Sequence, residues 1–249
     1  MKNIAIITGA TGGIGREFVR QVSDLEIDEI WAVGRNERIL SEFSGNIVTI
    51  KADISKHEGI EVIKDRLKSE MPNVRLLVNN AGVAYMGKYT EMSEEQITSM
   101  ISVNCTACAL LTRIVLNHMK SGAVIFNVSS ASSFQPNPYL TLYSASKVFV
   151  KNFSRALNVE LKAQKIRSVA VCPGWVDTDM LPRERQGKTI RYPGMVSPKK
   201  VVTHALKDAK RGKDVSVSSL YNKMLRILVK LYPTRIVMKT WTRGIKDYL

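Results

Sequence analysis

Short runs of apolar residues recur along the chain and alternate with stretches of helical spacing. The runs cover residues 4–7, 30–33, 47–50, 74–78, 123–128 and 169–172, and the longer helical stretches cover residues 58–70, 93–120 and 143–165. The runs are continuously apolar rather than alternating, which is typical of parallel strands that are covered on both faces. The pattern therefore predicts an α/β fold with a doubly wound parallel sheet.

The length of the chain predicts a single domain. With 249 residues, 45% of them hydrophobic, it can form one large core but is short for two. Within residues 1–249 we expect a core over residues 1–217, a mobile substrate loop over residues 176–197 and a basic C-terminal tail over residues 218–249.

The three cysteines do not form the pattern of a disulfide framework, because their number is odd and their surroundings are apolar or helical. Cys105 and Cys108 form a C-x-x-C, but no second pair or histidine cluster follows at the spacing of metal ligands. We therefore expect no metal site and a reducing compartment.

The N-terminal residues lack the apolar segment and cleavage site of a signal peptide, and no apolar stretch is expected to reach transmembrane length. These features predict a cytoplasmic protein. Peripheral association with a membrane through the tail is the alternative.

The positive charge is concentrated near the C-terminus. The formal net charge is +15, and residues 183–249 hold 17 of the 37 Lys and Arg residues but four of the 22 Asp and Glu residues. This asymmetry indicates an acidic partner, whether a phosphate-bearing substrate, an acidic carrier protein or an anionic lipid surface. No motif or aromatic platform for reading nucleic acid accompanies the charge, so we expect no nucleic-acid partner.

A glycine-rich segment, TGATGGIG at residues 8–15, follows the first strand and begins a helix. In that context backbone N–H groups and the helix N-terminus can approach a pyrophosphate.

The second strand ends at Arg35 rather than at an acidic residue that would accept a ribose 2′-OH. Because a guanidinium suits a 2′-phosphate, Arg35 favours NADP(H) over NAD(H).

Tyr143 and Lys147 stand four residues apart at the start of a helical stretch, so their side chains can meet on one face. An ammonium beside a phenol favours the phenolate and is expected to lower the pKa of Tyr143 toward the working range of a proton donor.

Together these motifs resemble the short-chain dehydrogenase/reductase family, whose fold is a Rossmann fold. The resemblance covers residues 3 to about 215, and its matching positions are Thr8, Gly9, Gly13, Ile14 and Gly15, Asp53, residues 79–82 (NNAG), Asn104, Ser129 and Ser130, residues 143–147 (YSASK) and residues 173–178 (PGWVDT). It implies that Tyr143 is the general acid, that Ser130 orients the substrate carbonyl, that Lys147 binds the nicotinamide ribose, and that Asn104 holds a water in a proton relay. A helix-bending amide in the core is the alternative interpretation of Asn104.

The resemblance also implies contacts with NADP(H). Asp53 would meet the adenine amino group, residues 79–82 would line the adenosine side, and Thr178 would contact the carboxamide and expose the pro-S hydride. The full set of expected cofactor-binding residues is Thr8, Gly9, Thr11, Gly13, Ile14, Gly15, Arg35, Asp53, Asn80, Ala81, Gly82, Tyr143, Lys147, Pro173, Gly174, Val176 and Thr178.

The C-terminal tail departs from the family pattern, and this departure puts the usual tetramer of the family in doubt. The expected oligomer is either a homodimer or a homotetramer. Lys223, Arg226 and Lys230 fall on one face of an amphipathic helical extension, with Leu220, Met224, Leu228 and Leu231 away from it. Such a helix can lie on an anionic membrane. The favoured expectation is an ordinary surface helix whose apolar face packs on the domain or across a dimer.

These observations predict an NADP(H)-dependent oxidoreductase that interconverts a ketone and a secondary alcohol. The tail favours a hydrophobic substrate such as a steroid or an acyl chain. One alternative is a β-ketoacyl-carrier reductase, whose acidic carrier would meet the basic tail. Another is a non-catalytic NADP(H)-sensing protein, although the presence of Asn104, Ser130, Tyr143 and Lys147 argues against it.

Overall fold

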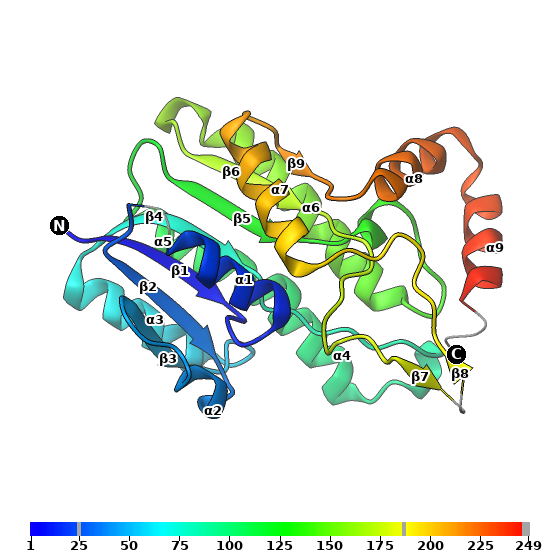
Figure 1. Ribbon diagram of the computed structural model, residues 1–249, viewed down its shortest axis with the longest axis horizontal. Helices are drawn as coiled ribbons and strands as arrows, with labels where there is room; N and C mark the ends of the chain where they lie inside the picture. The colour runs from blue at the N-terminus through cyan, green and yellow to red at the C-terminus, as the bar shows by residue number, and fades with distance from the viewer. Residues whose placement is uncertain (24–25, 186–187, 246–249) are drawn as a thin grey trace.

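The computed structural model describes residues 1–23, 26–185 and 188–245. At its centre is a seven-stranded sheet in the order β3-β2-β1-β4-β5-β6-β9, with every neighbouring pair parallel (Figure 1). The strands are β1 (Asn3–Thr8), β2 (Glu29–Gly34), β3 (Ile47–Lys51), β4 (Asn73–Asn79), β5 (Val124–Val128), β6 (Arg167–Val171) and β9 (Val215–Ser216). The doubly wound parallel sheet and the single domain predicted from the sequence are confirmed.

The helices follow the strands along the chain. They are α1 (Gly13–Val22), α2 (Glu37–Leu40), α3 (His57–Glu70), α4 (Glu94–Ile101), the π-helical η2 (Ser102–Ala107), α5 (Cys108–Leu116), α6 (Thr141–Glu160), α7 (Pro198–Lys210), α8 (Leu220–Leu231) and α9 (Thr234–Gly244), with short 3-10 turns η1 (Tyr89–Glu91), η3 (Ala131–Phe134) and η4 (Lys162–Gln164). The α7 helix is not among the helical stretches expected from the sequence.

Two apolar cores lie on opposite faces of the sheet. Ile4 and Ile6 of β1 face the layer of α3, α5 and α6, whereas Ala5 and Ile7 face α1 and α7. This alternation is the two-residue period of a strand. Because successive side chains enter opposite cores, both sets of positions along β1 are apolar and the run is continuous.

The segment after β6 contains local structure where a mobile loop was expected. It forms a small hairpin of β7 (Glu184–Arg185) and β8 (Lys188–Thr189), and Val176 pairs with Val196 in a parallel bridge. Residues 186–187 of the expected loop 176–197, and residues 246–249 of the expected tail 218–249, lie outside the described residues.

One helical stretch corrects the expectation that nothing reaches transmembrane length. Residues 94–116, formed by α4, η2 and α5, make a 23-residue helix long and apolar enough to cross a membrane. However, Met100, Ala107 and Leu111 are fully buried against the rest of the chain, and the polar Asn104 is buried in its middle. This helix is therefore a core helix of the fold, which its apolar composition alone could not indicate.

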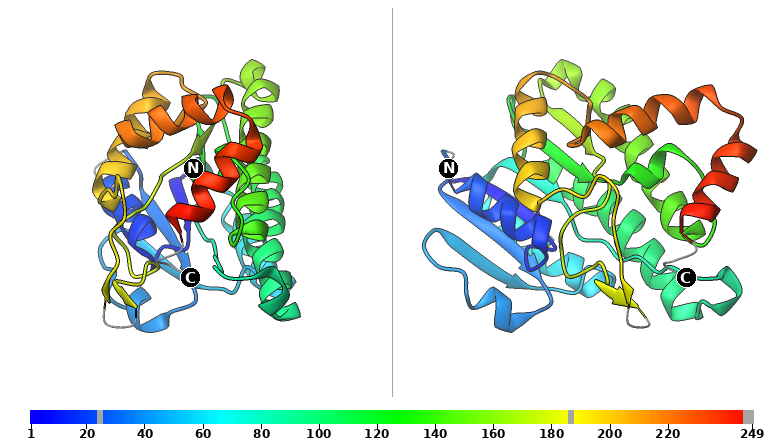
Figure 2. Two further views of the ribbon diagram at one scale, coloured as in Figure 1. Left: turned by 90° about the vertical axis from the view of Figure 1, so that its right-hand side faces the viewer. Right: turned by 45° about the vertical axis from the view of Figure 1, so that its right-hand side comes forward.

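The tail forms α8 and α9, which extend beyond the sheet (Figure 2). The apolar face of this extension was expected to pack on the domain or across a dimer. The first placement is wrong for α8, and the second stays a prediction. Leu220, Met224 and Leu231 are exposed, whereas Asn222 is buried against the body of the protein. Polar contacts hold this helix to the domain, as described below.

Candidate functional site

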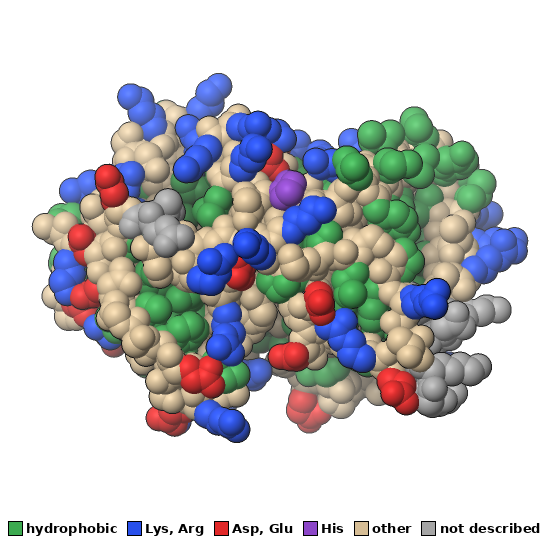
Figure 3. Space-filling view, in the orientation of Figure 1, with side chains coloured by type: hydrophobic (Ala, Val, Ile, Leu, Met, Phe, Trp, Pro, Cys, Tyr) green, Lys and Arg blue, Asp and Glu red, His purple; other side chains and the backbone are tan. Residues whose placement is uncertain are grey.

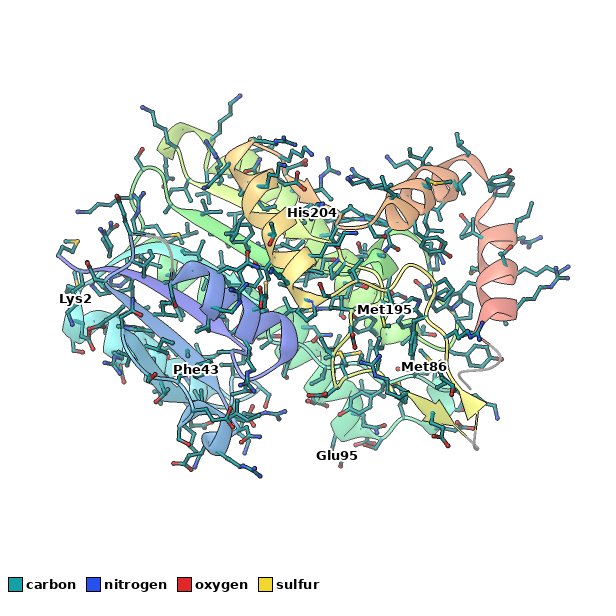
Figure 4. The ribbon with its side chains drawn as sticks, in the orientation of Figure 1. Lys2, Phe43, Met86, Glu95, Met195 and His204 are labelled. Carbon is teal, nitrogen blue, oxygen red and sulfur yellow. The ribbon has the colours of Figure 1, made fainter. Side chains whose placement is uncertain are left out.

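The carboxyl ends of the parallel strands open into a large cavity of about 1410 Å³. Its lining comes from the segments that follow β1 to β6, together with α8 and α9. Such a crevice beyond the strand ends is where open α/β sheets bind ligands. Met86, after β4, lies in the same half of the molecule as Met195 of the loop after β6, whereas Lys2 and Phe43 lie in the other half (Figure 4).

The glycine loop is tied to the segment after β4 through Thr8. The Thr8 hydroxyl donates to the Val78 carbonyl at 3.2 Å and accepts from the N–H groups of Asn80 and Ala81 at 3.0 and 3.1 Å. Gly9 has φ +63°, and a Cβ there would lie 2.8 Å from the Ala81 Cα. Only glycine satisfies both constraints.

Gly13 begins α1 and lies under Thr178. A Cβ on Gly13 would stand 2.5 Å from the Thr178 Cγ2, so the absence of a side chain lets the segment after β6 close over the loop. Gly12, Gly13 and Ile14 line the cavity at the N-terminus of this helix. The side-chain-free loop and the helix terminus together fit the pyrophosphate of a dinucleotide.

Arg35 and Asp53 line the cavity where β2 and β3 end. Burial alone would raise the pKa of the Asp53 carboxyl. Hydrogen bonds from the Ser55 hydroxyl at 2.7 Å and the Ser55 N–H at 3.1 Å, with the charges of Arg35 and Lys56, outweigh burial and lower that pKa. Asp53 therefore stays ionised near the exposed Arg35 guanidinium.

Asn104 and Lys147 converge over Gly82. A Cβ on Gly82 would lie 3.2 Å from the Lys147 Nζ and 3.3 Å from the Asn104 Oδ1. The Asn104 side chain accepts from the Val83 N–H at 2.9 Å and donates to the Val83 carbonyl at 3.0 Å and the Ser146 hydroxyl at 2.9 Å. These bonds fix η2 between the segment after β4 and α6.

Lys147 is buried, and its ammonium donates to the Val128 carbonyl at 2.9 Å. Burial lowers the pKa of Lys147 to about 8. The Nζ atom lies 5.6 Å from the centre of the Tyr143 ring, so the expected meeting of the two side chains on α6 is confirmed.

The expected depression of the Tyr143 pKa is wrong for the protein alone. Burial raises the pKa of Tyr143, and a hydrogen bond with Ser130 only partly opposes it. The phenol is therefore protonated at neutral pH. Ser130 itself accepts from the Ser132 N–H at 3.1 Å, which sets its orientation at the start of η3.

Most of the predicted site residues line the cavity. Three lie behind its wall, namely Thr8, Gly15 and Asn104, and position the residues that do. The lining residues in the predicted set are Gly9, Thr11, Gly13, Ile14, Arg35, Asp53, Asn80, Ala81, Gly82, Ser130, Tyr143, Lys147, Pro173, Gly174, Val176 and Thr178.

Sequence reasoning missed an aromatic cluster that lines the cavity. The Trp175 ring lies 4.9 Å from Tyr192 and 6.4 Å from Trp241 between centroids, and the Trp241 indole N–H donates to the Pro138 carbonyl at 2.9 Å. These residues come from two loops and α9. Their aromatic character was the only signal, because nothing in the sequence places them together.

Gln135 is a second residue that the sequence did not single out. It lines the cavity and is buried, yet its Oε1 atom has no hydrogen-bond partner among the described residues. A buried acceptor without a partner is costly unless a ligand satisfies it.

The fold and this site define a nucleotide-binding α/β oxidoreductase. Residues 3–189 match the family model of the short chain dehydrogenases. The chain belongs to that family.

Two curated relatives show the extent of the sequence similarity. The very-long-chain 3-oxoacyl-CoA reductase of Anas platyrhynchos is 35% identical over 191 residues, which cover 71% of this chain and 60% of that protein. The inactive hydroxysteroid dehydrogenase-like protein 1 of Homo sapiens is 34% identical over 190 residues, covering 71% of this chain and 56% of that protein. The chain thus spans less than two thirds of the length of either relative.

Solved structures share the fold over most of the chain. A short-chain dehydrogenase from Sphingobium yanoikuyae in complex with NADPH is 26% identical, with a TM-score of 0.76, and the match covers 88% of both chains. The 3-ketoacyl-(acyl-carrier-protein) reductase from Brucella melitensis complexed with NADH is 25% identical, with a TM-score of 0.72, and covers 86% of this chain and 95% of that one.

Proposed function

We propose that the protein uses NADP(H) to interconvert a ketone and a secondary alcohol on a hydrophobic substrate. The observation that carries this proposal is that Tyr143, Lys147 and Ser130 line the same cavity as apolar and aromatic residues of the loop after β6 and of the tail. A carbonyl held beside these three polar side chains can react while an apolar body occupies the rest of the cavity.

A reduced nicotinamide bound in this cavity would supply the hydride for the carbonyl carbon. The Tyr143 phenol then donates its proton to the carbonyl oxygen, and the Ser130 hydroxyl donates a hydrogen bond that orients this oxygen. The raised pKa of Tyr143 keeps the phenol protonated, as a proton donor requires. Lys147 would hold the ribose hydroxyls of the cofactor, and Asn104 would position Lys147 and support a water in the proton relay.

Arg35 is the residue that selects NADP(H) in this proposal. It is exposed at the cavity rim, and its charge reaches Asp53, which we assign to the adenine amino group. Binding of NADPH by the Sphingobium relative supports this choice, whereas binding of NADH by the Brucella relative shows that the fold accepts either dinucleotide.

The substrate class is an apolar ketone, with 3-oxoacyl thioesters as the first candidates. Leu225, Val229 and Val237 of the tail line the cavity together with Trp175 and Trp241, and they offer a long apolar surface. The names of the 3-oxoacyl-CoA reductases and of the Brucella reductase support an acyl chain, and the name of the human hydroxysteroid dehydrogenase-like protein keeps a steroid as the alternative. A carrier-bound 3-oxoacyl group, whose acidic carrier would meet the basic tail, is the closest variant of this proposal.

The experiment is a cofactor titration followed by a substrate panel. NADPH and NADH are titrated by fluorescence, and then 3-oxoacyl thioesters of increasing length, steroid ketones and aromatic diketones are added while absorbance of the reduced cofactor is followed. We expect tighter NADPH binding and the fastest turnover with a long apolar ketone. NADPH binding without turnover of any carbonyl would favour the non-catalytic sensor instead, a class for which the inactive human relative gives a precedent in name.

The oligomeric state is proposed to be a homodimer formed through α5 and α6, with the homotetramer as the alternative. Leu110, Phe149 and Val159 expose apolar side chains along these helices, and Phe149 stacks on Phe153 at 5.9 Å between ring centroids. Sedimentation equilibrium with Phe149→Glu tests this, because a charge there should give monomers.

We also propose a cytoplasmic location. Cys108 and Cys172 are buried free thiols, which suits a reducing compartment.

A further inference from the structure

The rotation of α8 about its own axis is fixed by polar contacts. Asn222 is buried, and the Ser219 hydroxyl at the N-cap accepts from its backbone N–H at 3.1 Å and from its side-chain amide at 2.9 Å. One turn later, the Arg226 guanidinium lies 5.7 Å from the centre of the Phe134 ring. Both contacts are made by the side of α8 that faces the domain.

This rotation directs the apolar side of α8 toward solvent. Leu220, Met224, Ile227 and Leu231 are 78%, 63%, 60% and 72% exposed, and their spacing of four, three and four residues forms one continuous stripe. We call these four residues the α8 stripe. Hydrophobic side chains gather over α8 and α9 in the space-filling view (Figure 3). So large an exposed patch indicates an interaction surface rather than scattered surface residues.

Basic residues border the α8 stripe. Lys223 and Lys230 are seven residues apart and therefore lie along one edge of the helix, about 90° from the centre of the stripe. No Asp or Glu occurs between Asp214 and Asp247, whereas this interval holds seven Lys and Arg residues after position 218. The surface is thus apolar at its centre and cationic at its margin.

We propose that the α8 stripe docks on an anionic phospholipid bilayer, with α8 lying in the plane of the membrane surface. An apolar stripe with lysines at its edge is the pattern of helices that rest at the interface, because the lysine ammonium groups reach the headgroups while the stripe enters the acyl region. Anionic headgroups supply the negative charge that would pair with the Lys and Arg residues of the tail.

A second copy of the chain fits this surface less well. A symmetric dimer would place the same patch against itself and bring the cationic margins of two tails together. Like charges at an interface oppose association, whereas an anionic bilayer attracts them.

The other edge of the stripe reaches the cavity. Leu228, Tyr232 and Ile236 are partly exposed and also line the cavity, so docking would bring this part of the cavity wall against the bilayer. An apolar substrate could then enter from the lipid phase, a consequence that rests on the proposed function. The docking itself does not depend on it.

Co-sedimentation with lipid vesicles tests the proposal on the full chain. Vesicles of phosphatidylcholine alone are compared with vesicles that also contain phosphatidylglycerol. We expect the protein to bind the second kind, and Ile227→Glu to weaken that binding by about tenfold or more because it places a charge in the acyl region. Lys223→Gln/Lys230→Gln should weaken it similarly, since each basic residue contributes about 1 kcal/mol near an anionic surface.

Met71→Glu is the matched control, because Met71 and Ile227 are both 60% exposed but Met71 follows α3, away from the tail. It should bind vesicles like the unmodified protein, and circular dichroism and NADPH binding confirm that each variant is folded. Equal vesicle binding by Ile227→Glu and the unmodified protein overturns the proposal. The proposal is also overturned if neither protein binds vesicles and the unmodified protein forms a dimer that Ile227→Glu dissociates. In that case a second copy of the chain would occupy the α8 stripe. If the unmodified protein binds vesicles but reduces no ketone, this result would count against the proposed function alone.

Discussion

The side chain of Asn222 lies directly over Gly174, and a Cβ on Gly174 would stand 2.7 Å from the Asn222 Cγ. This contact joins the first turn of α8 to the segment after β6, on which Thr178 closes over the glycine loop. The tail therefore packs on the same segment that covers the proposed cofactor site. The contact between Asn222 and Gly174 also fixes which side of α8 faces outward.

Replacing Gly174 by alanine should destabilise the protein through this contact. We expect Gly174→Ala to lower the free energy of unfolding by about 1–3 kcal/mol, the usual cost of overpacking. Removing the amide should relieve the clash, so Gly174→Ala/Asn222→Ala should lose less than the sum of the single variants in urea unfolding.

Gly244→Ala is the control for a glycine-to-alanine change, since a Cβ there meets no heavy atom within 4 Å among the described residues. It lies in α9, where alanine should be neutral or stabilising. Additive losses in the double variant would mean that Asn222 does not restrict position 174.

Replacing Arg35 should change the choice of cofactor. We expect Arg35→Ser to weaken NADPH binding by about tenfold or more, because a charge-assisted contact to the 2′-phosphate contributes about 1.5–3 kcal/mol. NADH binding should change little. Fluorescence titration of both cofactors measures this, with Arg38→Ser as an exposed neighbour that does not line the cavity. Equal weakening for the two cofactors would assign Arg35 another role.

The buried ammonium of Lys147 should make stability rise with pH. Its pKa is about 8 in the folded protein but about 10.4 in an unfolded chain. Between about pH 8 and about pH 10 the unfolded state therefore binds more protons, and the free energy of unfolding increases with pH. Below about pH 8 the folded state bears the full cost of the buried charge, about 3 kcal/mol from this shift.

Lys147→Met lacks this group, so its stability should rise less over the same range. Urea unfolding of both proteins at several pH values provides the comparison. Parallel curves would show that Lys147 carries no buried charge.

Trp241 should determine how well long substrates bind. We expect Trp241→Ala to raise KM for long-chain ketones by about tenfold, because it removes the stacking on Trp175 and the hydrogen bond to Pro138. Short ketones should be affected much less. Trp241→Phe keeps an aromatic ring and should retain most of the preference, and an equal effect on short and long ketones would place Trp241 outside the substrate site.

Most of the sheet could be predicted because β1 to β6 each carry a local run of mainly apolar residues, whereas the two-residue β9 does not. The runs at residues 4–7 and 30–33 lie within β1 and β2 and are buried throughout, as expected for strands that are covered on both faces. The residues of the glycine loop and of the Tyr143 and Lys147 pair also carry local patterns, and the fold brings them into one cavity.

The parts that could not be predicted depend on contacts between distant segments. The amphipathic pattern of α8 was recognised, but the direction of its apolar side depends on Asn222 over Gly174 and Arg226 over Phe134. Likewise, the pKa of Tyr143 depends on its burial, which raises it and outweighs the hydrogen bond with Ser130. The spacing of these residues in the sequence predicts neither effect.

Whether Tyr143 protonates a carbonyl in this cavity can be measured from the rate of NADPH oxidation by the unmodified protein and by Tyr143→Phe with the same long-chain 3-oxoacyl thioester. Phenylalanine keeps the ring and removes the hydroxyl group with its proton, so NADPH binding should be retained while kcat falls by about 100-fold or more. Turnover that persists within a few fold in Tyr143→Phe would show that Tyr143 is not the proton donor.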